Sequence, residues 1–327
     1  METTILELGT RAFHLLSARS GRTTGVELVP LGTERVALEA SIEATGKIGR
    51  RAGADALRAL GNLVAFAHRN GDGQIVAFAT PTLGGADNVD DYLHSVRKRY
   101  GFATPLLAPS ELLRLTYLAA QNELDLGDAP VTIAHLGHST LELGHGAFGK
   151  TPHAETLALG VARLHRAFGA CETGFPTDDV GALFSLVRLS CGPASRALDE
   201  FGRAPLVVAS EHVTAVCDVA RTWGYLDDDS TSLGRLALHA LVPEILAASP
   251  ATLCRLGVDP LRAPLVGTAA VILDALADLL GQREIRFTRS GAREGLALEA
   301  LATRENADLA DAGAANANVS RARWSRR

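Results

Sequence analysis

Two strand–turn–strand openings, one near the start of the chain and one near its middle, constrain the fold most. Each is built around a glycine, Gly9 in the first and Gly137 in the second. Glycine lets a main chain approach an anion closely, and the N–H groups of such a turn can converge on a phosphate. The repetition therefore predicts an internal duplication, with a phosphate-binding turn opening each half. The four predicted strands are Thr3–Leu8, Ala12–Ala18, Val131–Leu136 and Thr140–Gly144.

The rest of the chain alternates helical patterns with short apolar runs, which is typical of α/β proteins. The chain has 327 residues, the length of two ordinary domains. We expect lobes at 1–126 and 127–303, with Asn88 capping one helix. The predicted helices are Ala52–Arg69, Asn88–Tyr100, Ser110–Glu123, Val161–Phe168, Asp178–Phe201, Val213–Trp223, stretches within Leu233–Leu280, and Ala292–Arg304. Further extended segments are Gly25–Pro30, Gln74–Ala79, Leu157–Leu159, Leu206–Ser210 and Glu284–Thr288.

Composition narrows the class of partner and the cellular location. The net charge is −5, so no basic field over the whole chain attracts nucleic acid or an anionic membrane. Ala263–Leu280 is apolar but contains Asp274 and Asp278, which favours a buried helix over a membrane span. The N-terminus lacks the pattern of a signal peptide, and the four cysteines form no CxxC pair. We expect a cytoplasmic protein with reduced thiols.

The segment 304–327 is rich in Ala, Asn and Asp and ends in a cluster of arginines. It has no sustained apolar face that could pack on a core, so we expect a disordered tail. The basic end could contact acidic partners, but a solvated tail is the simpler interpretation.

Six segments, in the same order along the chain, resemble motifs of the Ppx/GppA family, which contains exopolyphosphatases and guanosine pentaphosphate phosphohydrolases. Residues 5–15 resemble its first phosphate motif, D-x-G-(S/T)-N-S-x-x-L, and residues 135–143 resemble its second, D-I-G-G-G-S-T-E-L. The other segments are 79–83, 114–118, 157–164 and a closing region made of 262–280 and 287–296, the latter containing R-E-G-L. The resemblance implies two actin-like, ribonuclease H-like lobes with a cleft between them.

The resemblance also implies a reaction. Water attacks the terminal phosphoanhydride of polyphosphate or of a guanosine nucleotide, a glutamate serves as base, and Mg²⁺ and backbone N–H groups neutralise the phosphate. Glu7 and Glu142 are the expected Mg²⁺ ligands, Glu7 and Glu111 the expected catalytic residues, and a homodimer is possible. The expected phosphate-binding residues are Gly9, Thr10, Arg11, Thr80, Gly137, His138 and Ser139.

Several family positions are altered. The first-motif Asp is Glu7, the second-motif Asp is His135, and the catalytic Glu is replaced by Leu112. Glu111 precedes Leu112 on the predicted helix, about 100° away around its axis. The family's S-G-T segment reads Ser210-Glu-His212, and the Arg of A-T-S-A-x-R is Gly84. Retained positions are Gly9, Thr10, Thr80, Gly137, Glu142, Gly160, Arg163, Arg293 and Glu294.

These departures leave two hypotheses about activity. The chain is either a hydrolase of weak activity that uses Glu111, Glu7 or His135, or a pseudoenzyme that binds phosphate or a nucleotide without turnover. A missing base costs about 10²–10⁴-fold in rate, which is why Leu112 separates the two.

Individual side chains admit further alternatives. His135, His138 and His145 could bind Zn²⁺, although drifted turn residues are the simpler interpretation. Arg11 could contact a bound anion, whereas for Arg163 and Arg293 ion pairs that hold the closing segment are favoured. Glu142 could point into the cleft. The run Asp227–Asp229 reads as a solvated loop.

Overall fold

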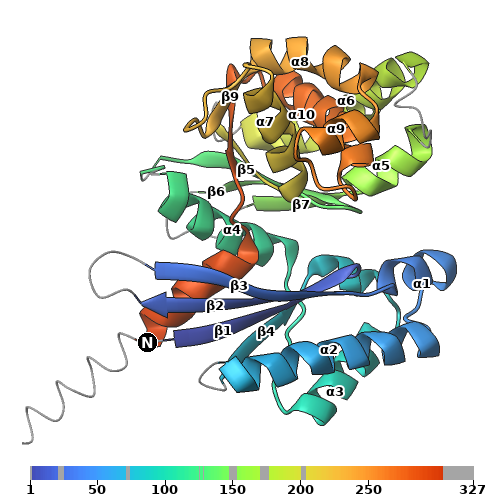
Figure 1. Cartoon of the computed structure of the whole chain (residues 1–327), viewed down its shortest axis with the longest axis vertical. Coiled ribbons are helices and arrows are strands. Elements are labelled where there is room, and N and C mark those ends of the chain that lie inside the picture. Colours follow the sequence, from blue (N-terminus) through green and yellow to red (C-terminus); the bar gives the residue numbers. More distant parts are fainter. Residues whose placement is uncertain are drawn as a thin grey trace, which may run out of the picture. The chain divides into compact units, whose positions relative to one another are not determined.

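The computed structural model describes residues 2–20, 26–70, 74–124, 126–127, 129–146, 153–169, 177–199 and 204–304. The chain folds into two compact units. The first is Met1–Leu107 together with the chain from Arg293 onward, and the second is Ala108–Ala292. Each unit has one β-sheet with helices packed on it (Figure 1), so the predicted α/β class with two lobes is confirmed. The tail expected at 304–327 lies, beyond Arg304, outside the described residues.

The sheet of the first unit has the strand order β3-β2-β1-β4. β1, β2 and β3 form the predicted antiparallel meander, and β4 pairs parallel to β1. β3 continues to Arg35, beyond the expected end at Pro30, because it pairs with the whole of β2. The strands are β1 Glu2–Leu8, β2 Ala12–Ser20, β3 Val26–Arg35 and β4 Ile75–Ala79.

One face of this sheet is covered by α2, whose Leu60 and Leu63 share an apolar core with Leu6 and Leu8 of β1. Asn88 occupies the N-cap position of α3, but its side chain does not cap that helix. It bonds both the N–H and the C=O of Ile48 instead, at 2.8 and 3.0 Å. The helices are α1 Leu38–Thr45, α2 Arg50–Asn70, α3 Val89–Tyr100 and the short η1 Pro81–Gly85.

The other face of the sheet is covered by the helix of residues 292–304, which is red-orange in Figure 1. Arg293 at its start bonds Glu7, and Arg304 at its end bonds the carbonyl of Glu2. The helix rises about 16.5 Å between these residues, and β1 covers about 16.5 Å between Glu7 and Glu2. The helix therefore runs antiparallel to β1 along almost its full length.

The sheet of the second unit has the strand order β7-β6-β5-β8-β10-β9. β5, β8 and β10 are parallel, whereas β6, β7 and β9 pair antiparallel to their neighbours. β7 and β9 are not among the predicted strands, apart from an extended segment expected at Leu157. The strands are β5 Val131–Leu136, β6 Leu141–Gly146, β7 His153–Leu157, β8 Leu206–Ala209, β9 Ser232–Gly234 and β10 Glu284–Thr288.

Side chains alternate between the two faces of this second sheet. Leu141 and Leu143 pack into the core formed with α5, α6, α7, α8 and α10, so Glu142 between them points to the opposite face. That face is covered by α4, which packs on β5, β6 and β7. The helices are α4 Pro109–Leu124, α5 Val161–Phe168, α6 Thr177–Asp199, α7 Glu211–Thr222, α8 Arg235–Ala247, α9 Pro250–Arg255 and α10 Val266–Leu279, with the short η2 Ala263–Leu265.

The unit boundaries differ from the expected division at 126/127 and 303. α4 belongs to the second unit because its apolar residues pack on the second sheet, and the helix of residues 292–304 belongs to the first. The apolar segment near residue 270 forms α10, whose side chains are buried, as expected. Among the described residues, no helix is both long and apolar enough to cross a bilayer.

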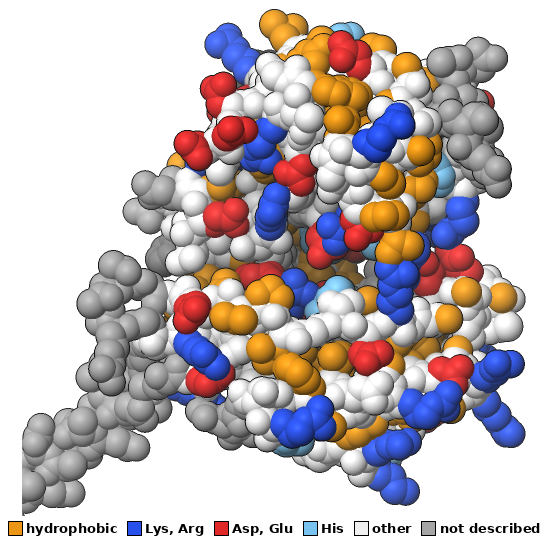
Figure 2. Space-filling model, viewed as in Figure 1, with side chains coloured by type: hydrophobic (Ala, Val, Ile, Leu, Met, Phe, Trp, Pro, Cys, Tyr) orange, Lys and Arg blue, Asp and Glu red, His pale blue; other side chains and the backbone are white. Residues whose placement is uncertain are grey.

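Two cysteines lie in the core of the second unit. Burial raises the pKa of Cys191 and of Cys217 to about 12, so both stay protonated and unreactive at neutral pH. Both are free thiols, as is the half-buried Cys254, whereas Cys171 is outside the described residues. On the face shown in Figure 2, acidic and basic side chains are interspersed.

Candidate functional site: the two glycine turns

The first glycine turn, at Gly9–Arg11, is tight, and hydrogen bonds to its carbonyl groups hold it in place. The N–H of Gly9 donates to the carbonyl of Ala12 at 3.1 Å, and a Cβ on Gly9 would lie 2.9 Å from that same oxygen. Glycine is therefore required at this position. The carbonyls of Thr10 and Arg11 accept hydrogen bonds from the N–H groups of Glu39 and Val36, at 3.0 and 2.8 Å.

The backbone N–H groups of Thr10 and Arg11 differ from the carbonyl groups of these residues in their hydrogen bonding. Among the described residues, the N–H groups of Thr10 and Arg11 have no hydrogen-bond acceptor. Thr10 is buried, with 8% of its surface exposed, whereas Arg11 is exposed. Two adjacent N–H donors whose carbonyls are already bonded can converge on an anion.

Two side chains beside this turn are engaged within the protein. The Arg11 guanidinium lies 3.4 Å from the Glu39 carboxylate and is 41% exposed, so a bound phosphate would share it with Glu39. Thr80 donates its N–H to the carbonyl of Leu8 at 3.0 Å, and its hydroxyl lies 2.9 Å from that of Thr82. Thr80 thus ties the end of β4 to the end of β1, next to the turn.

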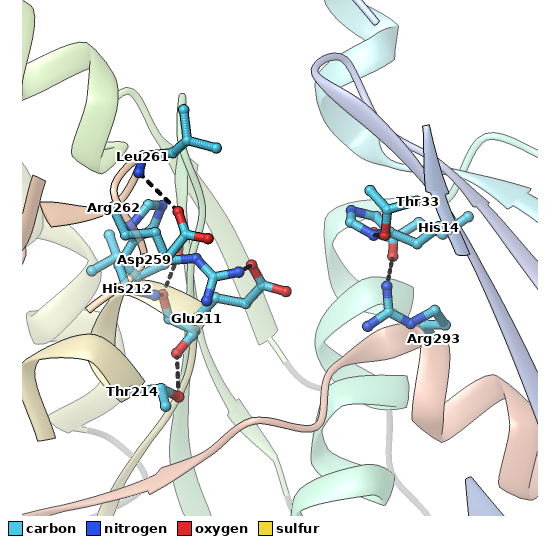
Figure 3. A network of polar contacts seen from close by, with 12 residues as sticks. His14, Thr33, Glu211, His212, Thr214, Asp259, Leu261, Arg262 and Arg293 are labelled. Carbon is cyan, nitrogen blue, oxygen red and sulfur yellow. Dashed lines mark hydrogen bonds and ion pairs between the residues drawn. The ribbon is translucent and has the colours of Figure 1, made fainter. Parts of the chain in front are cut away.

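Glu7 lies in a polar row that crosses the first sheet. Its neighbour in the strand register of β1 and β2 is His14, and the neighbour of His14 on β3 is Thr33. His14 Nδ1 lies 3.0 Å from Thr33 Oγ1, and Arg293 Nη1 lies 3.2 Å from Glu7 Oε2. Figure 3 shows His14, Thr33 and Arg293 gathered together. Arg293 also forms an ion pair with Glu294 at 2.9 Å. This retained arginine therefore pairs with two carboxylates of the protein itself.

His14 was not among the expected site residues. The signal that could have found it is the hairpin register: a turn centred on residues 10 and 11 places residue 14 opposite residue 7.

The second turn packs directly against the start of α5. The carbonyl of Gly137 accepts from the N–H of Val161 at 3.0 Å, and that of His138 accepts from Ala162 and Arg163 at 3.0 and 3.1 Å. The first N–H groups of α5 are therefore bonded to protein and cannot bind an anion. The Arg163 side chain is exposed and makes no ion pair with the described residues.

Two histidine rings meet beside the second turn. The rings of His138 and His212 contact edge to face, with centroids 4.5 Å apart. His212 is the second residue of α7, which is capped by Ser210: the Ser210 hydroxyl accepts from the N–H of His212 at 3.1 Å. Arg262 forms an ion pair with Glu211 at the same helix end (Figure 3).

Glu142, which could point into the cleft according to the sequence, is buried within its own unit. It is 1% exposed, and its Oε2 lies 2.9 Å from His135 Nδ1 on the neighbouring strand. Its Oε1 is buried and has no hydrogen-bond partner among the described residues.

The three histidines considered for Zn²⁺ do not form one site. His135 lies on the α4 side of the second sheet, while His145 shares the other side with Leu143. No group of three possible metal ligands occurs within the part of the chain that the structure describes.

The residues around the family's base position lie at the start of α4. Leu112 is 3% exposed and belongs to the core. Both carboxylate oxygens of Glu111 accept from Arg114, at 2.8 Å from Nε and 2.7 Å from Nη2. Glu111 is about one-third exposed, so water reaches it, but its negative charge is shared with a guanidinium.

The two expected Mg²⁺ ligands, Glu7 and Glu142, are each paired with a nitrogen-bearing side chain. Mg²⁺ prefers carboxylate oxygens in octahedral geometry and keeps several waters. Glu142 is closed to solvent and bonded to an imidazole, and Glu7 shares one oxygen with Arg293. These residues, as they are paired in the structure, do not fit a magnesium site.

The comparisons with known proteins agree with this architecture. The sequence model of the Ppx/GppA phosphatase family matches residues 20–304, and the chain belongs to this family. Its fold is accordingly the actin-like fold of that family.

Relatives cover nearly the whole chain. Exopolyphosphatase 1 of Mycobacterium leprae is 27% identical over 317 residues, 92% of this chain and 90% of the relative. Exopolyphosphatase 1 of Mycobacterium tuberculosis H37Rv is 25% identical, over 92% and 88%. Among solved structures, the Aquifex aeolicus Ppx/GppA family member has a TM-score of 0.77 at 15% identity, covering 93% of this chain and 98% of that one. An exopolyphosphatase from Cytophaga hutchinsonii has a TM-score of 0.75 at 16% identity, covering 90% and 96%.

Proposed function

We propose that this protein binds the phosphate end of inorganic polyphosphate and hydrolyses its terminal phosphoanhydride bond slowly. The observation that carries the proposal is the first turn, where the N–H groups of Thr10 and Arg11 find no acceptor among the residues that the structure describes, while their carbonyls are bonded. Family membership and the exopolyphosphatase relatives support this class of substrate. Guanosine pentaphosphate has the same terminal phosphoanhydride and is the alternative substrate.

The proposed reaction uses water alone as co-reactant. The oxygen of a water molecule forms a bond to the terminal phosphorus while the bridging P–O bond breaks. The products are orthophosphate and a chain one phosphate shorter. Backbone N–H groups at the first turn would stabilise the charge on the phosphate oxygens. The proton of the water would pass to a base, and Glu111 is the proposed one.

The charge environment of Glu111 is why we propose slow turnover. Both oxygens of this carboxylate already accept a hydrogen bond from Arg114, so the attacking water and Arg114 would compete for the same acceptor atoms. The apolar Leu112 beside it cannot accept a proton. The same observation favours the pseudoenzyme hypothesis as the second candidate. In that hypothesis the protein binds polyphosphate or a nucleotide and does not hydrolyse it. A cytoplasmic location and a homodimer remain part of the proposal.

The test is orthophosphate release from long-chain polyphosphate and, separately, from guanosine pentaphosphate. We expect slow release by the wild-type protein and a loss of about 10²-fold or more in Glu111→Gln, since a general base typically contributes that much. The matched control is Glu27→Gln, which removes a carboxylate from an exposed strand position.

Two other outcomes would redirect the proposal. Release that is unchanged in Glu111→Gln would remove Glu111 as the base. Binding of polyphosphate without release, by the wild type and by Glu111→Gln alike, would favour the pseudoenzyme. In that case Leu112→Glu, which restores a carboxylate at the family's base position, is the variant in which to look for a trace of activity.

A further inference from the structure

Each carboxylate expected to bind Mg²⁺ is already paired with a nitrogen of the same unit. In the first unit, Arg293 Nη1 lies 3.2 Å from Glu7 Oε2. In the second unit, His135 Nδ1 lies 2.9 Å from Glu142 Oε2. The two pairs are independent observations because they belong to different sheets.

In the pair of Glu7 and Arg293, each residue is held by a regular element of the first unit. Glu7 lies on the face of β1 that the helix of residues 292–304 covers, and Arg293 lies in the first turn of that helix. Arg293 and Glu7 are about one-fifth exposed each. A guanidinium cannot lose its proton near neutral pH, so the positive charge beside Glu7 is permanent. A divalent cation binding there would have to displace it or be repelled by it.

The second pair is more deeply buried. The register of β5 and β6 places His135 directly opposite Glu142, and the Glu142 side chain is only 2% exposed. The remaining oxygen, Oε1, is shielded from solvent as well. Mg²⁺ keeps several waters and selects oxygen ligands, whereas this carboxylate meets an imidazole nitrogen and no solvent.

We propose that this protein binds phosphate without a divalent cation on Glu7 or Glu142. Arg293 lies where a cation would neutralise the Glu7 carboxylate, and His135 lies where a cation would neutralise the Glu142 carboxylate. The inference goes beyond the proposed function, since it concerns the two carboxylates themselves and holds whether or not phosphate is released. It also identifies His135 as the residue that decides cation binding in the second unit.

The experiment is titration of the full chain with Mn²⁺, a paramagnetic substitute for Mg²⁺ whose free fraction is measured by electron paramagnetic resonance. No phosphate is present, so failure of the proposed function leaves this test intact. We expect no saturable site in the wild type up to about 1 mM, the weak end of the range for cation sites in proteins. His135→Asp, which places two carboxylates side by side, should show a saturable Mn²⁺ site with a Kd of about 0.1 mM or lower, at least about tenfold below that limit.

The matched control for that variant is His135→Asn, which has the same size as the Asp variant and no charge. It should bind no more Mn²⁺ than the wild type. A saturable Mn²⁺ site in the wild-type protein that is lost in Glu7→Gln or in Glu142→Gln would overturn the proposal. The wild-type titration decides this even if the His135 variants fold poorly.

Discussion

At the scale of single residues, Gly160 is the position where a side chain fits least. A Cβ there would lie 2.1 Å from the carbonyl carbon of Ser139 and 2.3 Å from that of His138. Gly160 precedes α5 and lies directly against the second turn, whose carbonyls accept the first N–H groups of that helix. The glycine thus allows the turn and the helix start to pack backbone against backbone.

We expect Gly160→Ala to lower the free energy of unfolding by at least about 2 kcal/mol, because a backbone segment must move to make room. The measurement is urea denaturation followed by circular dichroism. The control is Gly181→Ala in α6, where a Cβ meets open space and where alanine favours the helix by up to about 1 kcal/mol. Equal stability of the two variants would contradict this account of Gly160.

A second effect at this scale concerns pH. Burial lowers the pKa of His145, and burial together with the nearby Arg166 lowers that of His165. Each histidine binds a proton more readily in the unfolded chain than in the folded one. Their contribution to stability is therefore present above the unfolded pKa of about 6.5 and is lost as the pH falls below it.

The pH effect predicts that the free energy of unfolding decreases between pH 7.5 and 5.5, and that His145→Gln reduces this decrease by up to about 1 kcal/mol. Thermal or urea unfolding at both pH values measures it. His94→Gln, at an exposed position of α3, is the control that should leave the pH dependence unchanged. If His145→Gln keeps the full wild-type pH dependence, burial of this histidine is not the cause.

At the scale of elements, alternation of apolar residues predicted both hairpins around the glycine turns. It missed α1, β7 and β9, which are short. β9 has three residues, and its extended form depends on pairing with β10, some 50 residues later in the chain. Asn88 marked a helix start, as predicted, but its side chain bonds Ile48, a partner that local sequence does not reveal.

In the candidate site, too, local features could be predicted from the sequence, whereas contacts between distant residues could not. The glycines of both turns were predictable, because their requirement is local. The pairing of His135 with Glu142 followed from the hairpin register and could have been derived. The pairing of Glu7 with Arg293 could not, because 286 residues separate the two in sequence.

The helix of residues 292–304 yields a prediction about truncation. Ile5 and Phe78 share the face of the first sheet on which Glu7 lies, and Ala297 and Leu301 of the helix are buried. Each large apolar side chain that becomes exposed costs about 1.5–3 kcal/mol, against a total stability of about 5–15 kcal/mol for a domain. A chain that ends at Gly291 should therefore fail to fold its first unit.

The measurement is the cooperative melting transition of the truncated chain, and the control is a chain that ends at Arg304. That control removes only residues without an apolar pattern, so its melting temperature should stay near that of the full chain. A Gly291 truncation that melts like the full chain would show that the helix is dispensable. A large drop for the chain ending at Arg304 would show that the tail packs on the body.

At the scale of the whole molecule, family membership explains why six weak motifs in the correct order were informative. None of them alone identifies a fold. The family model covers residues 20–304, which include five of the six segments, and the first segment, residues 5–15, lies before that match. Family membership does not fix the chemistry. The chemistry depends on the side chains that this sequence carries, such as Glu7, Leu112 and His135, and on their surroundings in the structure.

The division of the chain into units has a consequence for biosynthesis. The first unit contains residues that precede Ala108–Ala292 and is completed by residues 293–304, which are synthesised after that whole stretch. Ala108–Ala292, in contrast, is one uninterrupted stretch. During translation the second unit can reach its final form while the first sheet still lacks the helix that covers Ile5. For that interval, an apolar face of the nascent chain is open to chaperones or to another nascent copy.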